Sequence, residues 1–243
     1  MQTFEIYHGD FRQILNGLAG KAVITDPPYG VGLDYGGFVD SVEYVQSIIP
    51  PLIEMSNRIA DVLLFPSGQY EIEKWIFQNY PPRWRICWYK GAQSTASVIG
   101  FSDWEMIFVY GNNIYNFAHD YFFAKTAPAD NGHPCPKSVA WARWLVEKFT
   151  NPGDTVIDPF MGSGTTGVAC MELGRKFIGI DQSEKFCKIA ENRIKNAQPA
   201  LFTTMRQPNT RLQPTAYGAG GQSKIPLQGS LFADESSAKN GGG

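Results

Sequence analysis

Residues 26–30 read Asp-Pro-Pro-Tyr-Gly and follow a short apolar run. Because neither proline carries an N–H, the carbonyls of Asp26 and Pro27 stay free to accept hydrogen bonds. An acidic side chain, a rigid carbonyl and an aromatic ring together suit a planar amine, with Asp26 and Pro27 accepting its two N–H groups and Tyr29 stacking on the ring. The lone pair of such an amine is normally delocalised into the heterocycle. Two acceptors would favour a tetrahedral amine, whose lone pair is then available as a nucleophile. An ordinary proline turn is the alternative.

Residues 158–167 form a second segment of this kind, Asp-Pro-Phe-Met-Gly-Ser-Gly-Thr-Thr-Gly. Its glycines would let the backbone approach a ligand, and the helix that follows would present free N–H groups there. The segment also matches the pattern G-x-G-x-x-G, and Asp181 lies 19 residues beyond Gly162. That spacing suits a carboxylate that accepts hydrogen bonds from ribose hydroxyls. A tight strand-to-helix turn without a ligand is the alternative.

The elements around these loops predict an α/β fold. Residues 3–10, 21–30 and 60–68 each read as a strand that ends in an abrupt turn, and 154–174 and 175–196 read as strand, loop and helix. Residues 84–91 and 103–111 resemble an antiparallel pair, while 42–60 is a helical pattern that Pro50 and Pro51 would kink or split. Alternation of strands and helices favours a mostly parallel sheet with an antiparallel edge, whose active site lies at the carboxyl ends of the strands.

Composition bounds the class of protein. The 243 residues, 43% of them hydrophobic, suffice for one domain with a core, which we assign to 1–198; residues 199–243, rich in Gly, Pro and Ser, we expect to be disordered. A net charge of -2 gives no global attraction to nucleic acid. Four cysteines without a CxxC pair predict reduced thiols and no metal site. Without a leader peptide or an apolar run of membrane-spanning length, we expect a cytoplasmic protein.

Together the motifs resemble those of the DNA amino-methyltransferases, which use S-adenosylmethionine to methylate adenine N6 or cytosine N4. That family carries (D/N/S)PP(Y/F/W) and DPFxGSGTT, and the second stands unchanged at 158–166. Residues 8–15, HGDFRQIL, match its GDxxxxL segment, and 133–138, HPCPKS, resemble its HPxxKP element. The catalytic loop precedes the cofactor loop, the circularly permuted order of the beta class. The resemblance implies a Rossmann-like methyltransferase fold with a seven-stranded sheet.

The resemblance also implies roles for single residues. Asp26, Pro27, Pro28 and Tyr29 would be catalytic. Asp181 would hold the ribose of the cofactor and Asp10 its adenine amine. The other residues implied to surround the cofactor are His133, Lys137, Ser138, Asp158, Phe160, Gly162, Ser163, Gly164 and Thr165. Ser138 stands where the family usually has proline.

The implied reaction is direct transfer of a methyl group to the exocyclic amine of a base flipped out of double-stranded DNA, as in restriction-modification systems. Asp at the first motif position is more typical of adenine enzymes, so adenine N6 is favoured over cytosine N4; an RNA substrate is a weaker alternative. Two other classes also remain. An NAD(P)-dependent oxidoreductase would share the glycine pattern but leave DPPY unexplained, and a non-catalytic DNA-binding subunit would not need the intact Asp26.

Two further segments suggest partners. Arg83, Arg85 and Lys90 stand among tryptophans and tyrosines and could contact DNA phosphates or bases, although an ordinary sheet edge explains them equally well. The segment 112–132 is short for a target-recognition region, which suggests relaxed specificity or a homodimer.

The C-terminal region contains a candidate docking peptide. Residues 228–232, QGSLF, match the pentapeptide by which bacterial proteins dock on the replication sliding clamp. Gln228, Leu231 and Phe232 would make that contact. A chance Leu-Phe pair in a linker is the alternative. If the peptide is real, it indicates a protein that acts in a bacterial cell, encoded by the bacterium or a phage.

Overall fold

The computed structural model describes residues 3–33, 39–91, 95–96, 100–111, 119–127 and 137–197. All of them lie in one compact unit, Met1–Thr203. The predicted boundary after residue 198 and the tail beyond it lie outside the described residues, so they stay predictions. No helix in the described part of the chain combines the length and apolar character needed to cross a bilayer.

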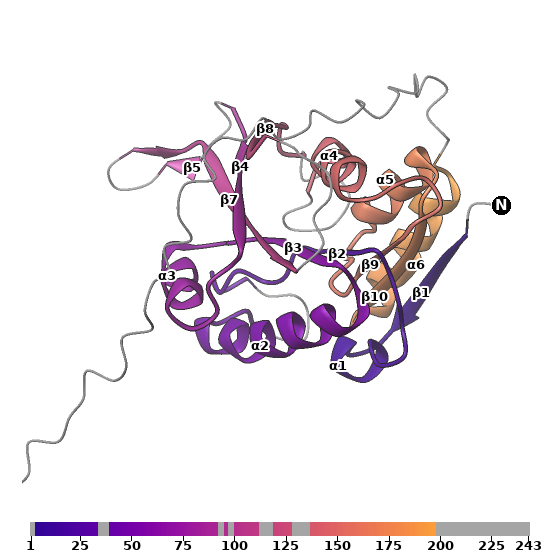
Figure 1. The fold of residues 1–243 in the computed structure, drawn as a ribbon, viewed down its shortest axis with the longest axis horizontal. Coiled ribbons are helices and arrows are strands. Elements are labelled where there is room, and N and C mark those ends of the chain that lie inside the picture. The colour runs from indigo at the N-terminus through magenta and orange to yellow at the C-terminus, as the bar shows by residue number, and fades with distance from the viewer. Residues whose placement is uncertain are drawn as a thin grey trace, which may run out of the picture. The chain divides into compact units, whose positions relative to one another are not determined.

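Strands and helices alternate as the sequence predicts (Figure 1). In chain order the elements are β1 Phe4–His8, α1 Phe11–Ile14, β2 Ala22–Ile24, α2 Val42–Ile59, β3 Val62–Pro66, α3 Tyr70–Asn79, β4 Trp84–Tyr89, β5 Thr95–Ala96, β6 Phe101–Ser102, β7 Trp104–Gly111, β8 Tyr121–Phe123, α4 Val139–Phe149, β9 Thr155–Asp158, α5 Thr165–Leu173, β10 Lys176–Asp181 and α6 Glu184–Lys195.

The main sheet has the strand order β1-β10-β9-β2-β3-β7-β4-β8, and β5 pairs with β6 separately. Neighbours from β1 to β3 are parallel, whereas β7 runs antiparallel to both β3 and β4. The predicted antiparallel pair is therefore confirmed. The sheet has eight strands rather than seven, because the short β8 pairs parallel to β4 and extends that edge. The antiparallel strand β7 lies inside the sheet and not at its edge, because β4 pairs with it on the outer side.

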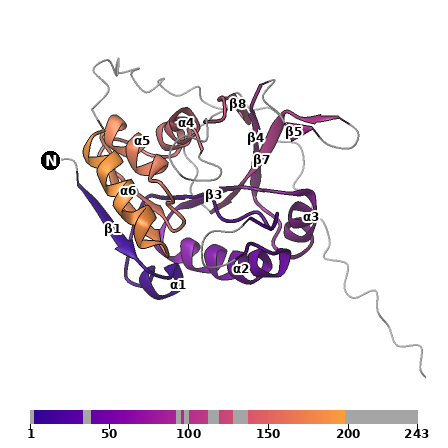
Figure 2. The ribbon, with the colours of Figure 1, turned by 180° about the vertical axis from the view of Figure 1, so that it is seen from behind.

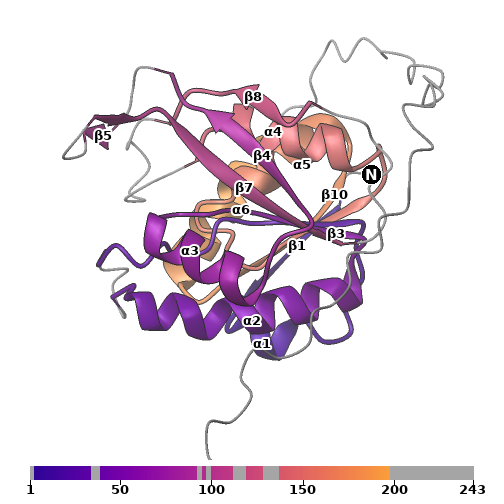
Figure 3. The same ribbon diagram turned by 60° about the vertical axis from the view of Figure 1, so that its left-hand side comes forward.

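Both faces of the sheet are covered, as the alternating pattern predicts (Figures 2 and 3). One core packs α1, α2 and α3 against residues such as Val23 of β2 and Ile157 of β9. The other packs α4, α5 and α6 against residues such as Ile24 and Val156. Successive strand residues enter opposite cores because side chains alternate across a sheet.

Helix α2 is continuous over 18 residues although it contains Pro50 and Pro51, so the predicted split does not occur. The prolines remove two backbone N–H donors. Burial of Ile48, Ile49 and Leu52 against the sheet stabilises the helix in spite of that loss. Ser183 is the N-cap of α6 and accepts a 3.4 Å hydrogen bond from the Phe186 N–H.

Candidate active site

The DPPY loop and the glycine loop lie side by side at the carboxyl ends of β2 and β9. These two strands are parallel neighbours, with Val23 opposite Ile157. Thr25, the residue before Asp26, donates a 2.6 Å hydrogen bond from Oγ1 to Oδ1 of Asp158 and accepts one of 3.2 Å from the Phe160 N–H. The predicted amine site at residues 26–29, here called the notch, and the predicted cofactor loop therefore meet at one edge of the sheet.

Asp40 fixes the shape of the DPPY loop from within. Its side chain is fully buried, and its Oδ2 accepts hydrogen bonds from the backbone N–H groups of Tyr29, at 3.1 Å, and Gly30, at 3.0 Å. Its Oδ1 accepts a 2.5 Å hydrogen bond from the Leu33 N–H. These contacts satisfy N–H groups in a segment that has no strand partner, so Asp40 holds the loop in a single conformation.

Tyr29 points its hydroxyl at the Asp26 carboxylate. The hydroxyl donates a 2.8 Å hydrogen bond to Oδ1 of Asp26 and lies 3.2 Å from Oε2 of Glu105. Gly68, two residues after β3, lies against the side of the ring. A Cβ atom added at Gly68 would lie 2.9 Å from Cγ of Tyr29, and the φ of +74° also favours glycine. The ring can occupy this position because residue 68 has no side chain.

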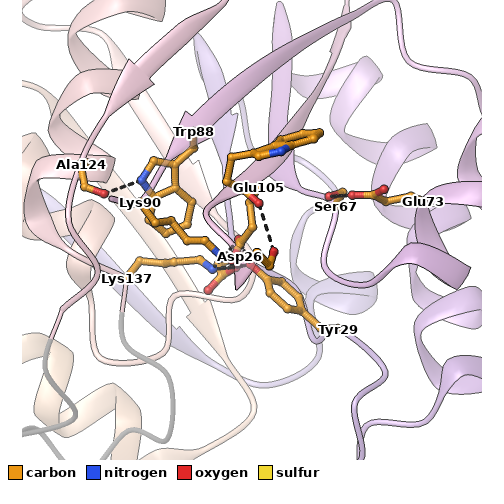
Figure 4. Close-up of polar contacts among 11 residues, drawn as sticks. Asp26, Tyr29, Ser67, Glu73, Trp88, Lys90, Glu105, Ala124 and Lys137 are labelled. Carbon is orange, nitrogen blue, oxygen red and sulfur yellow. Dashed lines mark hydrogen bonds and ion pairs between the residues drawn. The ribbon is translucent and has the colours of Figure 1, made fainter. Parts of the chain in front are cut away.

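Lys137 closes the notch opposite Tyr29 (Figure 4). Its Nζ lies 3.4 Å from Oδ1 of Asp26 and 3.3 Å from Oε2 of Glu105, and it donates a short hydrogen bond to the Tyr29 hydroxyl. The ammonium is also 5.0 Å from the ring centroid of Trp88. Lys90 pairs with the other oxygen of Glu105 at 3.1 Å. Two ammonium groups and two carboxylates thus alternate in the order Lys90, Glu105, Lys137 and Asp26.

Burial and mutual pairing set the charges of this cluster. Burial raises the pKa of Asp26, and the Lys137 charge opposes that shift without cancelling it. Burial also acts to raise the pKa of Glu105, but Lys137 and Lys90 outweigh it and leave the pKa lowered. For Lys137, burial acts to lower the pKa, yet Asp26 and Glu105 together raise it. Lys137 is therefore a permanent cation and Glu105 a permanent anion near neutral pH.

The glycine loop between β9 and α5 is held by side chains from neighbouring elements. The Gly162 N–H donates a 2.9 Å hydrogen bond to Oδ2 of Asp181, at the end of β10. Arg193 of α6 donates from its guanidinium to the carbonyl and to the hydroxyl of Ser163, both at 2.6 Å. Gly164, with φ +83°, caps α5 without a side-chain hydrogen bond. The backbone N–H groups at the start of α5 therefore face the loop and not a capping side chain.

Three carboxyl groups surround this loop. Asp158 is buried and lies beneath it; burial raises its pKa to about 7, against the lowering effect of hydrogen bonds from Thr25 and Phe160. Asp181 is only partly buried and also accepts a 2.8 Å hydrogen bond from the Ser183 N–H. Asp10 follows β1, the parallel neighbour of β10, where it caps α1 and pairs with Arg12. Asp10 and Asp181 therefore stand at adjacent strand ends.

Most of the residues that the sequence singles out converge on this edge. The Lys137 side chain enters the notch of Asp26, while its backbone carbonyl accepts a 3.3 Å hydrogen bond from Thr165 of the glycine loop. Ser138 is the N-cap of α4. His133 lies outside the described residues, as do Gln228, Leu231 and Phe232, so their roles stay predictions.

The predicted basic cluster does not form. Arg83 and Arg85 are exposed, but Lys90 is buried and its ammonium faces Glu105. The reason is the alternation along β4, which turns Ile86, Trp88 and Lys90 to the inner face. Lys90 is therefore unavailable to DNA phosphates, and only the two arginines remain as predicted contacts.

Sequence reasoning overlooked four residues that shape the site: Thr25, Asp40, Glu105 and Arg193. Thr25 directly precedes the DPPY motif, and that position is the signal that points to it. Glu105 stands in an apolar strand, where a buried acid indicates a partner or a function. Nothing in the spacing of Asp40 or Arg193 predicts contacts with loops 7 to 11 and 30 residues away.

Comparison with known proteins agrees with this geometry. The family model described as "DNA methylase", N6_N4_Mtase, matches residues 88–192. YubD of Escherichia coli (strain K12), which bears the name of a candidate methylase, is 27% identical over 215 residues, 79% of this chain and 91% of that protein. The type II methyltransferase M2.DpnII of Streptococcus pneumoniae is 44% identical over 63 residues, which are 26% of this chain and 24% of that protein.

Solved structures show the same fold. The M1.HpyAVI complex with S-adenosylmethionine superposes with a TM-score of 0.61 at 25% identity, over 79% of this chain and 99% of that one. The cytosine-N4-specific PvuII DNA methyltransferase superposes with a TM-score of 0.61 at 15% identity, over 79% of this chain and 86% of that one, a likeness of fold alone.

The fold and the paired loops define an α/β methyltransferase-type protein. Within that class, residues 88–192 match the N6/N4 DNA methylase family model, and the chain is similar over most of its length to YubD and to M1.HpyAVI. The assignment of this chain to the circularly permuted beta class stays a prediction.

Proposed function

We propose that this protein transfers a methyl group from S-adenosylmethionine to the exocyclic amine of a base flipped out of double-stranded DNA, with adenine N6 as the preferred target. The observation that carries the proposal is the hydrogen bond of Thr25 to Asp158, which holds the Asp26 notch against the glycine loop. A donor bound on one loop and an acceptor amine bound on the other would then be neighbours.

The residues around the glycine loop fit S-adenosylmethionine. Asp181 and Asp10 offer carboxylates at adjacent strand ends, which suit the ribose hydroxyls and the adenine amine. The start of α5, which has no side-chain cap, offers backbone N–H groups for a carboxylate. When bound, the cofactor supplies an electrophilic methyl group on a sulfonium sulfur.

The chain's own residues would position the amine. The Asp26 carboxylate and the Pro27 carbonyl accept its two N–H groups, and the Tyr29 ring stacks on the base. Both acceptors direct the lone pair of the amine toward the neighbouring loop. Catalysis would then rest on orientation and on exclusion of water, without a covalent enzyme intermediate.

Adenine N6 is favoured because aspartate opens the DPPY motif, as is more typical of adenine enzymes; cytosine N4 is the second candidate. Such a reaction on DNA places the activity in the bacterial cytoplasm. Contact of Arg83 and Arg85 with DNA, a homodimer, and docking of residues 228–232 on the sliding clamp stay predictions from the sequence.

Sequencing that identifies modified bases in DNA from expressing cells tests the proposal. Wild-type protein should add N6-methyladenine at a defined site. Asp26→Ala should abolish the mark, while S-adenosylmethionine still binds the purified variant with an affinity within about threefold of wild type. Glu54→Ala, a change at an exposed residue of α2, is the matched control.

Two outcomes would contradict the proposal. Unmodified DNA with the wild-type protein would remove the enzymatic assignment, and methylation by Asp26→Ala would remove the role of Asp26. Titration with NAD(P) separates the oxidoreductase alternative, because the proposal requires that only S-adenosylmethionine binds.

A further inference from the structure

Lys137 presents a donor immediately beside the acceptor proposed for the target amine. Its Nζ lies 3.4 Å from Oδ1 of Asp26, the same oxygen that accepts the Tyr29 hydroxyl. A base whose amine binds Asp26 therefore brings the next atom of its ring close to an ammonium group. Figure 4 shows Lys137 and Tyr29 converging on Asp26 from different elements.

Adenine and cytosine carry an amine, N6 or N4, where guanine and thymine carry the carbonyls O6 and O4, and the ring atom beside that amine is the same in both. Adenine N1 and cytosine N3 are acceptors next to the amine, whereas guanine N1 and thymine N3 carry a hydrogen. A carboxylate beside an ammonium is complementary to an amine beside an unprotonated ring nitrogen. If guanine or thymine entered, the Asp26 carboxylate would face a carbonyl oxygen and the Lys137 ammonium would face an N–H. Both contacts would then be repulsive.

Glu105 keeps the ammonium at this position. Its Oε2 lies 3.3 Å from Nζ of Lys137, while Lys90 holds its Oε1 at 3.1 Å. The Lys137 backbone is anchored too, through its carbonyl to Thr165 and through Ser138 at the start of α4. An ammonium has three donors, so Lys137 can turn one from Asp26 or Tyr29 to a base while Glu105 retains another.

We propose that Lys137, positioned by Glu105, donates a hydrogen bond to the ring nitrogen adjacent to the target amine and thereby selects adenine or cytosine against guanine and thymine. This inference rests on the proposed function. It assigns Lys137 a direct contact with the base, although the sequence places it at the cofactor, and it makes Glu105 a positioning residue.

The test combines a change in the protein with a change of one atom in the base. Duplexes carry the methylation site found by sequencing, with either the natural base or its deaza analogue, 1-deazaadenine for adenine or 3-deazacytosine for cytosine. Wild type should lose roughly 10- to 100-fold in kcat/KM on the analogue, the size expected for a hydrogen bond from a charged donor. Lys137→Met should lose a similar factor on the natural base, with no further loss on the analogue.

Matched variants separate this role from a structural one. Lys137→Arg keeps a charged donor and should retain part of the discrimination between the two duplexes. Glu105→Gln should weaken that discrimination while S-adenosylmethionine affinity stays near wild type. Lys188→Met, which removes an exposed ammonium from α6, should behave as wild type.

The outcomes are distinguishable. If wild type methylates the natural duplex but Lys137→Met loses the same factor on both duplexes, the contact with the ring nitrogen is wrong and the proposed function stands. If wild type methylates neither duplex nor cellular DNA, the proposed function itself fails. Should Lys137→Met not fold, equal kcat/KM of wild type on the two duplexes would still overturn the inference.

Discussion

Thr25 and Asp158 are 133 residues apart in the sequence, yet the Thr25 hydroxyl donates a 2.6 Å hydrogen bond to the Asp158 carboxyl. Thr25 is directly followed by Asp26, and Asp158 opens the glycine loop. This contact therefore joins the two loops that the family resemblance identifies as catalytic and cofactor-binding. Both partners are buried, so no water replaces either of them easily.

Thr25→Val tests how strongly this contact couples the two loops. Valine matches the shape of threonine but leaves the Asp158 carboxyl without that donor. We expect the free energy of unfolding to fall by about 1–3 kcal/mol and kcat for methyl transfer to fall roughly tenfold. Thr155→Val makes the same change at the start of β9. Equal effects of both substitutions on kcat would show that the contact does not couple the loops.

Asp158 predicts a pH dependence of stability. Burial raises its pKa to about 7 from an ordinary value of 3.8, so the folded state favours the protonated form. Its contribution to stability is fully present below pH 3.8 and is lost as pH rises through about 7. In Asp158→Asn this dependence disappears, because an amide does not ionise.

Thermal unfolding at several pH values checks this expectation. The free energy of unfolding of Asp158→Asn minus that of wild type should rise between pH 5 and pH 7, by about 1.4 kcal/mol per pH unit, and level off by pH 8. The difference between the two Tm values should rise in the same range. The difference between the two proteins isolates Asp158 from the other titrating groups. A constant difference across this range would mean that the pKa of Asp158 is close to its ordinary value.

Asp40 should govern catalysis without touching substrate. Asp40→Ala removes the acceptor of the Tyr29, Gly30 and Leu33 N–H groups, and we expect it to lower the free energy of unfolding by about 2–4 kcal/mol. At a temperature where the variant remains folded, kcat should fall at least tenfold while S-adenosylmethionine affinity, measured by calorimetry, is retained. Asp40→Asn, which keeps one acceptor oxygen, should lie between. Equal losses of cofactor affinity and kcat would indicate a general loss of structure.

The local patterns of the sequence determine most of the elements and the two key loops. Apolar runs that end at Asp26 and Asp158, and the glycines that follow the second, predict parallel strands with functional loops at their carboxyl ends. These strands and loops depend on residues that are close in the sequence, so they can be predicted from it directly. The continuity of α2 through Pro50 and Pro51 is different, because it depends on burial against the sheet.

Only the tertiary structure decides which side chains complete the site. Glu105 comes from β7 and Lys90 directly follows β4, and the pairing of Glu105 with Lys90 and Lys137 depends on strand order and on the face to which each residue turns. The same alternation removes Lys90 from the surface where its neighbours Arg83 and Arg85 are exposed. Charges in a buried cluster interact through space, and the number of residues between them in the sequence does not determine their distances in the fold.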